Sequence, residues 1–159
     1  MGNYFEIEPN NIIHECSIEE TASYRLNWEK VFCKDKQGAN TKAYLWHIFS
    51  FEKYPAISGL EATNEYIKHV SPEYVVLSNE DELAVISNAR PENCSLRDYY
   101  IFPKNMAWTM AFTHEDGWLG PYFAKHLNYK ELNAQNETKL QALEKKKQEI
   151  AHAKSKGWL

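Results

Sequence analysis

The spacing of apolar residues predicts a helix near the beginning of the chain. The apolar residues that recur at helical spacing in this segment are Tyr24, Trp28, Val31 and Phe32. They predict one buried face on a helix from about Ile18 to Cys33. Ser17 and Glu20 form a capping box, in which the Ser17 hydroxyl accepts from the Glu20 amide and the Glu20 carboxylate reaches back to the Ser17 amide.

The next two elements are predicted from an aromatic run and a second capping pattern. Residues Ala43–Ser50 are apolar at both odd and even positions, which indicates a strand covered on both faces and placed centrally in a sheet. Ser58 and Glu61 have the spacing of a capping box that opens a second helix. The predicted buried face of that helix consists of Leu60, Asn64, Ile67 and Val70. The Ser71-Pro72 step closes it.

Two hairpins are predicted in the middle of the chain. The first pairs a strand at Tyr74–Leu77 with one at Leu83–Ile86. The second pairs Asp98–Phe102 with Met106–Thr113 across a turn at Pro103-Lys104-Asn105. In the last strand Trp108, Met110 and Phe112 share one face, and Thr109, Ala111 and Thr113 share the other.

A long polar helix is predicted at the end of the chain, starting at about Asn128. Its apolar positions are Leu132, Leu140, Leu143 and Ile150, and only its first half is expected to dock. The order of elements predicts an α+β fold with a mainly antiparallel sheet packed against helices. We therefore expect a single α+β domain over residues 1–128 and a charged helix over 129–159 that extends from it.

Composition indicates a globular protein that needs no disulfide. The 159 residues are 43% hydrophobic and 25% charged, as in ordinary globular domains. Cys16, Cys33 and Cys94 are odd in number and have no paired spacing, which argues against a disulfide framework and a cysteine zinc site. Residues 1–6 lack a basic region and an apolar run, and no segment approaches the length of a membrane span. We expect a cytoplasmic protein that does not bind membranes.

Charge is divided unevenly along the chain. Residues 1–128 contain 11 basic and 18 acidic side chains, and residues 129–159 contain 7 and 4. An acidic body disfavours nucleic acid and favours a basic protein partner. The run Lys145–Lys147 has acidic neighbours at Glu144 and Glu149, so we interpret it as a solvated helix face.

The residues best able to carry function follow the last predicted strand. A strand that ends in polar residues and a Gly-Pro loop is a common place for a binding site, because the sheet holds residues that the loop exposes. The candidate binding residues are Trp108, Thr113, His114, Glu115, Asp116, Trp118 and Tyr122.

The chemistry of this loop favours recognition over catalysis. No second histidine follows His114 at the i+4 spacing of a helical zinc motif, so no metal site is predicted. A His114–Glu115 pair suits acid–base chemistry, but no nucleophile or oxyanion loop is recognisable beside it. The six glycines form no phosphate-binding pattern, and no cofactor is predicted. The alternative role for His114 and Glu115 is to fix the loop by hydrogen bonds to nearby backbone.

Three segments together resemble a family of small bacterial proteins catalogued only as a domain of unknown function. They are residues 44–51, Tyr99–Pro103, and Trp108–Glu115 followed by Gly120–Phe123, with the signature LWHxFS…WTxxxTHE…GPYF. The resemblance spans residues from about 18 to 124. It implies an intracellular bacterial protein, and it implies no activity, substrate or catalytic residue.

Three functions are compatible with these observations. Small acidic bacterial proteins often serve as immunity proteins, and by this analogy we expect a non-enzymatic, immunity- or inhibitor-like protein that recognises a basic protein partner and neutralises a toxin. The alternative is a small hydrolase or a metal or acid–base enzyme centred on His114 and Glu115. A third possibility is a module whose C-terminal helix associates with itself, and the oligomeric state is left open.

Overall fold

An antiparallel sheet forms the centre of the molecule. The computed structural model describes residues 5–35, 39–115 and 118–158. In this part of the chain, seven strands pair in the order β2-β5-β4-β7-β8-β9-β3, with every pairing antiparallel. In that order their bounds are Ile12–Glu15, Val85–Ser87, Tyr74–Ser78, Tyr99–Phe102, Trp108–Phe112, Tyr122–Lys125 and Ile57–Ser58.

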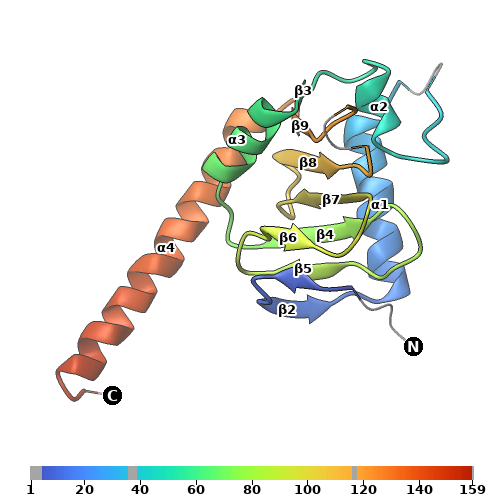
Figure 1. The fold of residues 1–159 in the computed structure, drawn as a ribbon. Helices are drawn as coiled ribbons and strands as arrows, with labels where there is room; N and C mark the ends of the chain where they lie inside the picture. Colours follow the sequence, from blue (N-terminus) through green and yellow to red (C-terminus); the bar gives the residue numbers. More distant parts are fainter. Residues whose placement is uncertain (1–4, 36–38, 116–117, 159) are drawn as a thin grey trace.

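Helices cover both faces of this sheet (Figure 1). One face packs against α1 (Ile18–Phe32) and the short α2 (His47–Ser50). The other face packs against α3 (Leu60–Lys68) and the first turns of α4 (Tyr129–Ser155). A separate two-stranded ribbon joins β1 (Ile7–Glu8) to β6 (Asn93–Cys94). The predicted α+β fold with a long C-terminal helix is confirmed.

The first helix agrees with its prediction because its signals are local. Ser17 is the N-cap, its hydroxyl accepts from the Glu20 amide at 3.0 Å, and the Ser17 amide donates to the Glu20 carboxylate at 2.9 Å. Trp28 and Phe32, one turn apart, are fully buried against the sheet. The capping box therefore sets where α1 begins, and the two rings set which side it buries.

The predicted central strand at Ala43–Ser50 is wrong. Residues 41–46 form turns, and α2 follows at His47–Ser50. Rings at Trp46 and Phe49 are buried against α1 and the end of the sheet, so the run is apolar at both parities without being a strand. The strands buried at every position are β5, β4 and β7, which are neighbours in the sheet. A short apolar run does not distinguish a buried strand from a buried turn and helix.

The predicted start and buried face of the second helix are also wrong. Ser58 lies in β3 and pairs with Tyr122, while Gly59 is the N-cap of α3 and makes no side-chain cap. Gly59 has φ 68°, a conformation that glycine adopts without steric cost. Leu60 is 76% exposed, and the buried residues of α3 are Ala62 and Tyr66. The position of the helix on the sheet decided which side became buried.

Both predicted hairpins are present, with a longer turn in the second. β5 pairs with β4, and β8 pairs with β7 in the register Tyr99↔Phe112. The Met106 amide donates to the Pro103 carbonyl at 2.8 Å, and Met106 has φ 58°, so β8 begins only at Trp108. The alternation predicted for β8 is observed, because Met110 packs beneath α3 whereas Ala111 belongs to the core beneath α1.

The long helix α4 docks through its first turns. Tyr129 hydrogen-bonds to His69 at 2.5 Å, and Asn136 donates to the Asn105 side chain at 3.1 Å. Residues 141–158 are exposed apart from the half-buried Ala153. Figure 1 shows the helix leaving the body diagonally, with the C-terminus at its far end.

Candidate functional site

The loop after β8 meets a carboxylate from the neighbouring strand. The register of β7 and β8 places Asp98, just before β7, opposite Thr113 and next to His114. His114 Nδ1 lies 2.9 and 3.0 Å from the two carboxylate oxygens of Asp98. The His114 backbone amide donates to Asp98 Oδ1 at 3.0 Å. One carboxylate thus holds both the ring and the backbone of His114.

The Asp98 carboxylate also joins this loop to the segment before α2. The buried indole of Trp46 donates to Asp98 Oδ1 at 3.0 Å, and the Asp98 side chain is 7% exposed. The Trp46 amide donates to the Tyr100 hydroxyl at 3.0 Å. A buried carboxylate is stable when several donors replace its water. Asp98 therefore connects three parts of the chain that are distant in sequence.

Aromatic rings cover the imidazole of His114. The Tyr44 ring lies 5.1 Å from it and the Trp46 ring 6.2 Å, measured between ring centroids. Tyr122 in turn stacks on Trp46 at 6.4 Å with an interplanar angle of 24°. The His114 side chain keeps 21% of its surface exposed. This environment restricts the directions from which a ligand approaches the ring.

The second ring nitrogen of His114 lies near a second carboxylate. Its Nε2 lies 3.7 Å from a carboxylate oxygen of Glu115, whose side chain is 41% exposed. A carboxylate on Nδ1 fixes the tautomer and leaves Nε2 as the reactive nitrogen, as a general base requires. The ion-pair partners of the imidazole among the described residues are both carboxylates, Asp98 and Glu115. The arrangement orients the His114 ring between two carboxylates.

The shape of the loop depends on Thr113 and Gly120. The Thr113 hydroxyl donates to the Leu119 carbonyl and accepts from the Glu115 amide at 3.2 Å. Gly120 has φ 103°, and a Cβ there would lie 2.9 Å from Cγ2 of Thr113 and 3.2 Å from the Tyr122 ring. Only glycine fits this close approach without displacing its neighbours. Thr113 and Gly120 thus shape the loop.

Trp118 is the exposed residue among the described members of the predicted set. The residue is 87% exposed, and its amide donates to the Glu115 carbonyl at 3.0 Å. Trp118 borders a groove of about 520 Å³ between the loop and the segment around α2 and β3. Other residues lining this groove include Phe49, Glu52, Tyr54, Ser58 and Tyr122.

Trp108, another residue of the predicted set, lies away from the loop. Trp108 is fully buried beneath α3 and α4, where its ring contacts Tyr66, His69 and Phe123. It lies in the core opposite the one that contains Tyr122. Asp116 lies outside the described residues. The structure therefore brings Thr113, His114, Glu115, Trp118 and Tyr122 into one region and leaves Trp108 out.

Comparison with known families gives one match. Residues 14–123 match the family described as a domain of unknown function, DUF4275. The chain belongs to this family. Comparisons with curated proteins and with solved structures give no match. In the part of the chain that the structure describes, no helix combines the length and apolar character needed to cross a membrane.

Within the matched DUF4275 region, the structure gives a role to a residue that sequence reasoning missed. Asp98 was predicted only as the first residue of a strand. With a three-residue turn at Pro103–Asn105, the predicted register would have placed it opposite Met110, three residues short of Thr113. The longer turn shifts the register and brings Asp98 to His114. No signal in the sequence specified that turn length.

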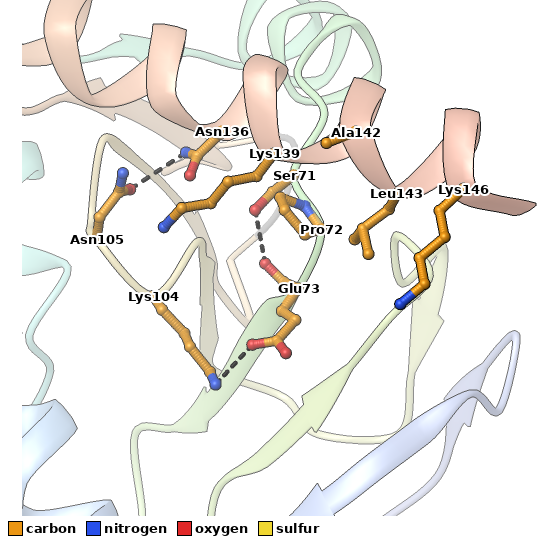
Figure 2. A pocket seen from close by; sticks show the side chains of 10 residues that line it. All are labelled: Ser71, Pro72, Glu73, Lys104, Asn105, Asn136, Lys139, Ala142, Leu143 and Lys146. Atoms are coloured by element: carbon orange, nitrogen blue, oxygen red, sulfur yellow. Dashed lines mark hydrogen bonds and ion pairs between the residues drawn. The ribbon is translucent and has the colours of Figure 1, made fainter.

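A second groove lies beneath α4. The residues of α4 that line it follow residue 123, so they lie outside the DUF4275 match. The groove has a volume of about 690 Å³ and is shown in Figure 2. Lys139, Leu143 and Lys146 of α4 face it across from Lys104 and Glu73, which form an ion pair of 2.6 Å. This groove is basic along the helix, in contrast to the groove bordered by Trp118.

Proposed function

We propose that this protein is a non-enzymatic binding protein, immunity- or inhibitor-like, that recognises a basic protein partner in the bacterial cytoplasm. The observation that carries the proposal is Trp118, a large ring 87% exposed beside a groove on the body. Tryptophan is enriched among the residues that dominate binding energy at protein interfaces. An exposed ring held at the mouth of a groove suits an anchor for a partner.

Charge supports a basic partner for this groove. Glu52 lines it, and Glu115 stands at the base of the turn that carries Trp118. The body, residues 1–128, has seven more acidic than basic side chains. Complementary charge increases the rate of association and selects against acidic partners. A basic segment lying in the groove would meet carboxylates and pack its aliphatic stems on Trp118.

The hydrogen bonds between Asp98, His114 and Trp46 support recognition more than catalysis. Asp98 accepts from Trp46, from the His114 amide and from the His114 ring, so its oxygens are engaged within the protein. This network holds the base of the loop that presents Trp118. A rigid support reduces the conformational entropy that a binding loop loses when a partner docks.

The test compares two exposed tryptophans. The tagged wild-type chain, Trp118→Ala and Trp158→Ala are used to capture proteins from the native host. Trp158, 69% exposed beyond the end of α4, is the matched control. We expect a basic protein that binds wild type and Trp158→Ala in a 1:1 complex, and a loss of about 30-fold in affinity with Trp118→Ala.

Two results of the same measurement would overturn the proposal. One is the absence of any stoichiometric complex with the purified wild-type chain. The other is a complex whose affinity is the same with Trp118→Ala as with wild type. Increasing the salt concentration should weaken the complex of the wild-type chain with its basic partner, because salt screens the attraction between exposed charges.

The alternative function is a small hydrolase or acid–base enzyme centred on His114 and Glu115. Asp98 on His114 Nδ1 favours it, because this contact leaves Nε2 available as a base. His114→Ala and Glu115→Ala distinguish the two proposals. An enzyme predicts that both variants stay folded and lose binding of a substrate analogue. A structural histidine predicts that His114→Ala lowers the free energy of unfolding.

A further inference from the structure

Three potential metal ligands converge where β2 meets α1, far from Trp118 in the sequence. His14 lies in β2, Cys16 follows directly after the strand ends at Glu15, and Glu20 lies in the first turn of α1. Residues two apart in extended chain direct their side chains to the same side. The capping box turns the Glu20 carboxylate back toward the beginning of the helix. Local backbone geometry thus brings the imidazole, the thiol and the carboxylate together.

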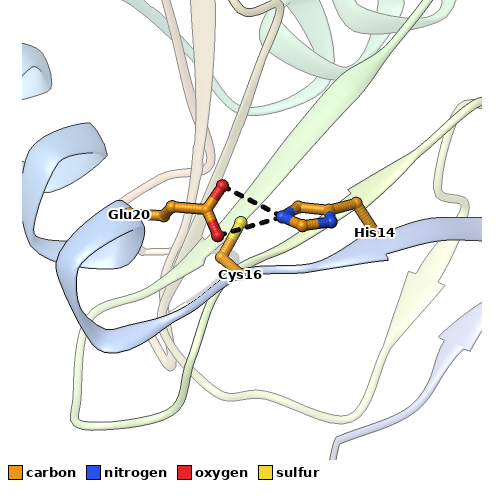
Figure 3. A group of neighbouring side chains, drawn as sticks. All are labelled: His14, Cys16 and Glu20. Carbon is orange, nitrogen blue, oxygen red and sulfur yellow. Dashed lines mark hydrogen bonds and ion pairs between the residues drawn. The ribbon is translucent and has the colours of Figure 1, made fainter.

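The three side chains face a common point in Figure 3. His14 Nε2 lies 3.0 Å from each carboxylate oxygen of Glu20. The ligand atoms of His14, Cys16 and Glu20 all lie within 4.8 Å of one another. A tetrahedral zinc site with bonds of about 2.0–2.3 Å separates its ligand atoms by about 3.5 Å. Side-chain movements of about 1 Å would bring these atoms to that geometry.

Burial gives the group a closed side and an open side. The Cys16 residue is 2% exposed, whereas the side chains of His14 and Glu20 are 47% and 45% exposed. An ion can therefore enter from solvent and meet the thiol at the back of the site. A fourth position on the solvent side remains for water, as in zinc sites with three protein ligands.

The surroundings of the Cys16 thiol oppose its ionisation, so it would become a thiolate ligand only when a metal ion binds. Burial raises the pKa of Cys16 to about 11, and the Glu20 carboxylate acts in the same direction. Lys104, which opposes this shift, is ion-paired with Glu73 at 2.6 Å. Without a metal the thiol keeps its proton at neutral pH. A bound cation would displace that proton to solvent, because coordination deprotonates a thiol.

We propose that His14, Cys16 and Glu20 bind a zinc-class divalent cation. The ligands would be Nε2 of His14, with its ring proton on Nδ1, the Sγ thiolate of Cys16, and one carboxylate oxygen of Glu20. The other Glu20 oxygen continues to accept from the Ser17 amide. Thiolate and imidazole ligands select zinc over magnesium or calcium, which prefer oxygen. The ion joins the edge strand β2 to the start of α1.

Cobalt(II) provides a direct probe, because a thiolate ligand gives a charge-transfer band in the near ultraviolet. The full chain, stripped of metal and kept reduced with a non-chelating reductant, is titrated with Co²⁺ and then with Zn²⁺. We expect one equivalent of Co²⁺ to produce the thiolate band and Zn²⁺ to abolish it. Absence of the band in the wild-type chain overturns the proposal.

Variants assign the ligands. Cys16→Ser should remove the band, and Cys94→Ser, which changes another cysteine, should keep it. Because Cys16 is buried and its replacement could disturb folding, His14→Gln at the exposed ligand is the second test. His14→Gln should weaken Zn²⁺ binding at least about tenfold by calorimetry, while His126→Gln should leave it unchanged. A band retained in folded Cys16→Ser, or an unchanged affinity in His14→Gln, contradicts the assignment.

Discussion

Among the described residues, two histidine–carboxylate pairs have similar distances of about 3 Å and different surroundings. His114 and Asp98 are joined at 2.9 Å beneath Tyr44 and Trp46, and the Asp98 carboxylate receives two further hydrogen bonds. His14 and Glu20 are joined at 3.0 Å on the surface, beside a buried thiol. Both members of the second pair are nearly half exposed.

This difference indicates what each pair is suited to do. A buried carboxylate engaged by several donors is costly to disturb and holds the surrounding chain in place. An exposed pair contributes little to stability and can exchange its mutual contact for another ligand. A short distance between histidine and carboxylate therefore does not define function. The two pairs differ in their burial and in the number of other hydrogen bonds that the carboxylate accepts. These two properties indicate that His114–Asp98 stabilises the structure and that His14–Glu20 can exchange its contact for a ligand.

The largest expected effect is from removing the buried carboxylate. Asp98→Ala leaves the Trp46 indole and the His114 amide without their acceptor. We expect a loss of about 2–4 kcal/mol in the free energy of unfolding, measured by urea denaturation. A loss below about 1 kcal/mol would show that the two pairs are energetically alike.

A third histidine extends the comparison to pH. His69 Nδ1 donates to the Glu65 carbonyl at 2.6 Å, so in the neutral ring Nε2 accepts from the Tyr129 hydroxyl. Burial lowers the pKa of His69 below that of the unfolded chain, and burial also lowers the pKa of His126. The unfolded chain then binds more protons than the folded one, and stability falls as pH decreases below about 6.5.

His69→Gln tests this dependence. Glutamine keeps a donor and an acceptor but does not titrate, so the variant should lose less stability than wild type between about pH 7.5 and 5.5. Urea denaturation at several pH values gives both slopes. Equal slopes for the two proteins would assign the pH dependence to other groups, with His126→Gln as the comparison.

A smaller effect is expected at the exposed pair. His14→Gln removes the imidazole from Glu20, while the Ser17 amide still donates to the Glu20 carboxylate. With a chelator present to exclude metal, the loss of stability should be no more than about a third of that for Asp98→Ala. An equal loss in both variants would contradict the distinction between buried and exposed pairs.

The smallest effect is expected at Glu115, the second carboxylate near His114. Its nearest oxygen is 3.7 Å from His114 Nε2 and its side chain is 41% exposed. Glu115→Gln should change the free energy of unfolding by less than about 0.5 kcal/mol. Thermal and urea unfolding measure it, and a loss approaching that of Asp98→Ala would make Glu115 an equal part of the buried network.

Sequence reasoning placed the candidate loop but not the partner of its histidine. Thr113, His114 and Trp118 follow a strand that alternating residues predicted, so their location could be inferred. The contact of His114 with Asp98 depends on the register of β7 and β8, which the longer turn at Met106 sets. The proposed ligand group at His14, Cys16 and Glu20 is different, because it depends on extended chain and a capping box, which are local features.

Local interactions allowed the sequence alone to determine the capped start of α1, the two hairpins, the alternating faces of β8 and the long polar helix α4. Each depends on residues within a few positions of one another. Tertiary structure decided the rest. Residues 43–50 became turns and α2, α3 buried Ala62 and Tyr66 in place of Leu60, and Asp98 came to lie against His114. The physical reason is that packing against distant elements chooses which apolar face is buried and which register a strand adopts.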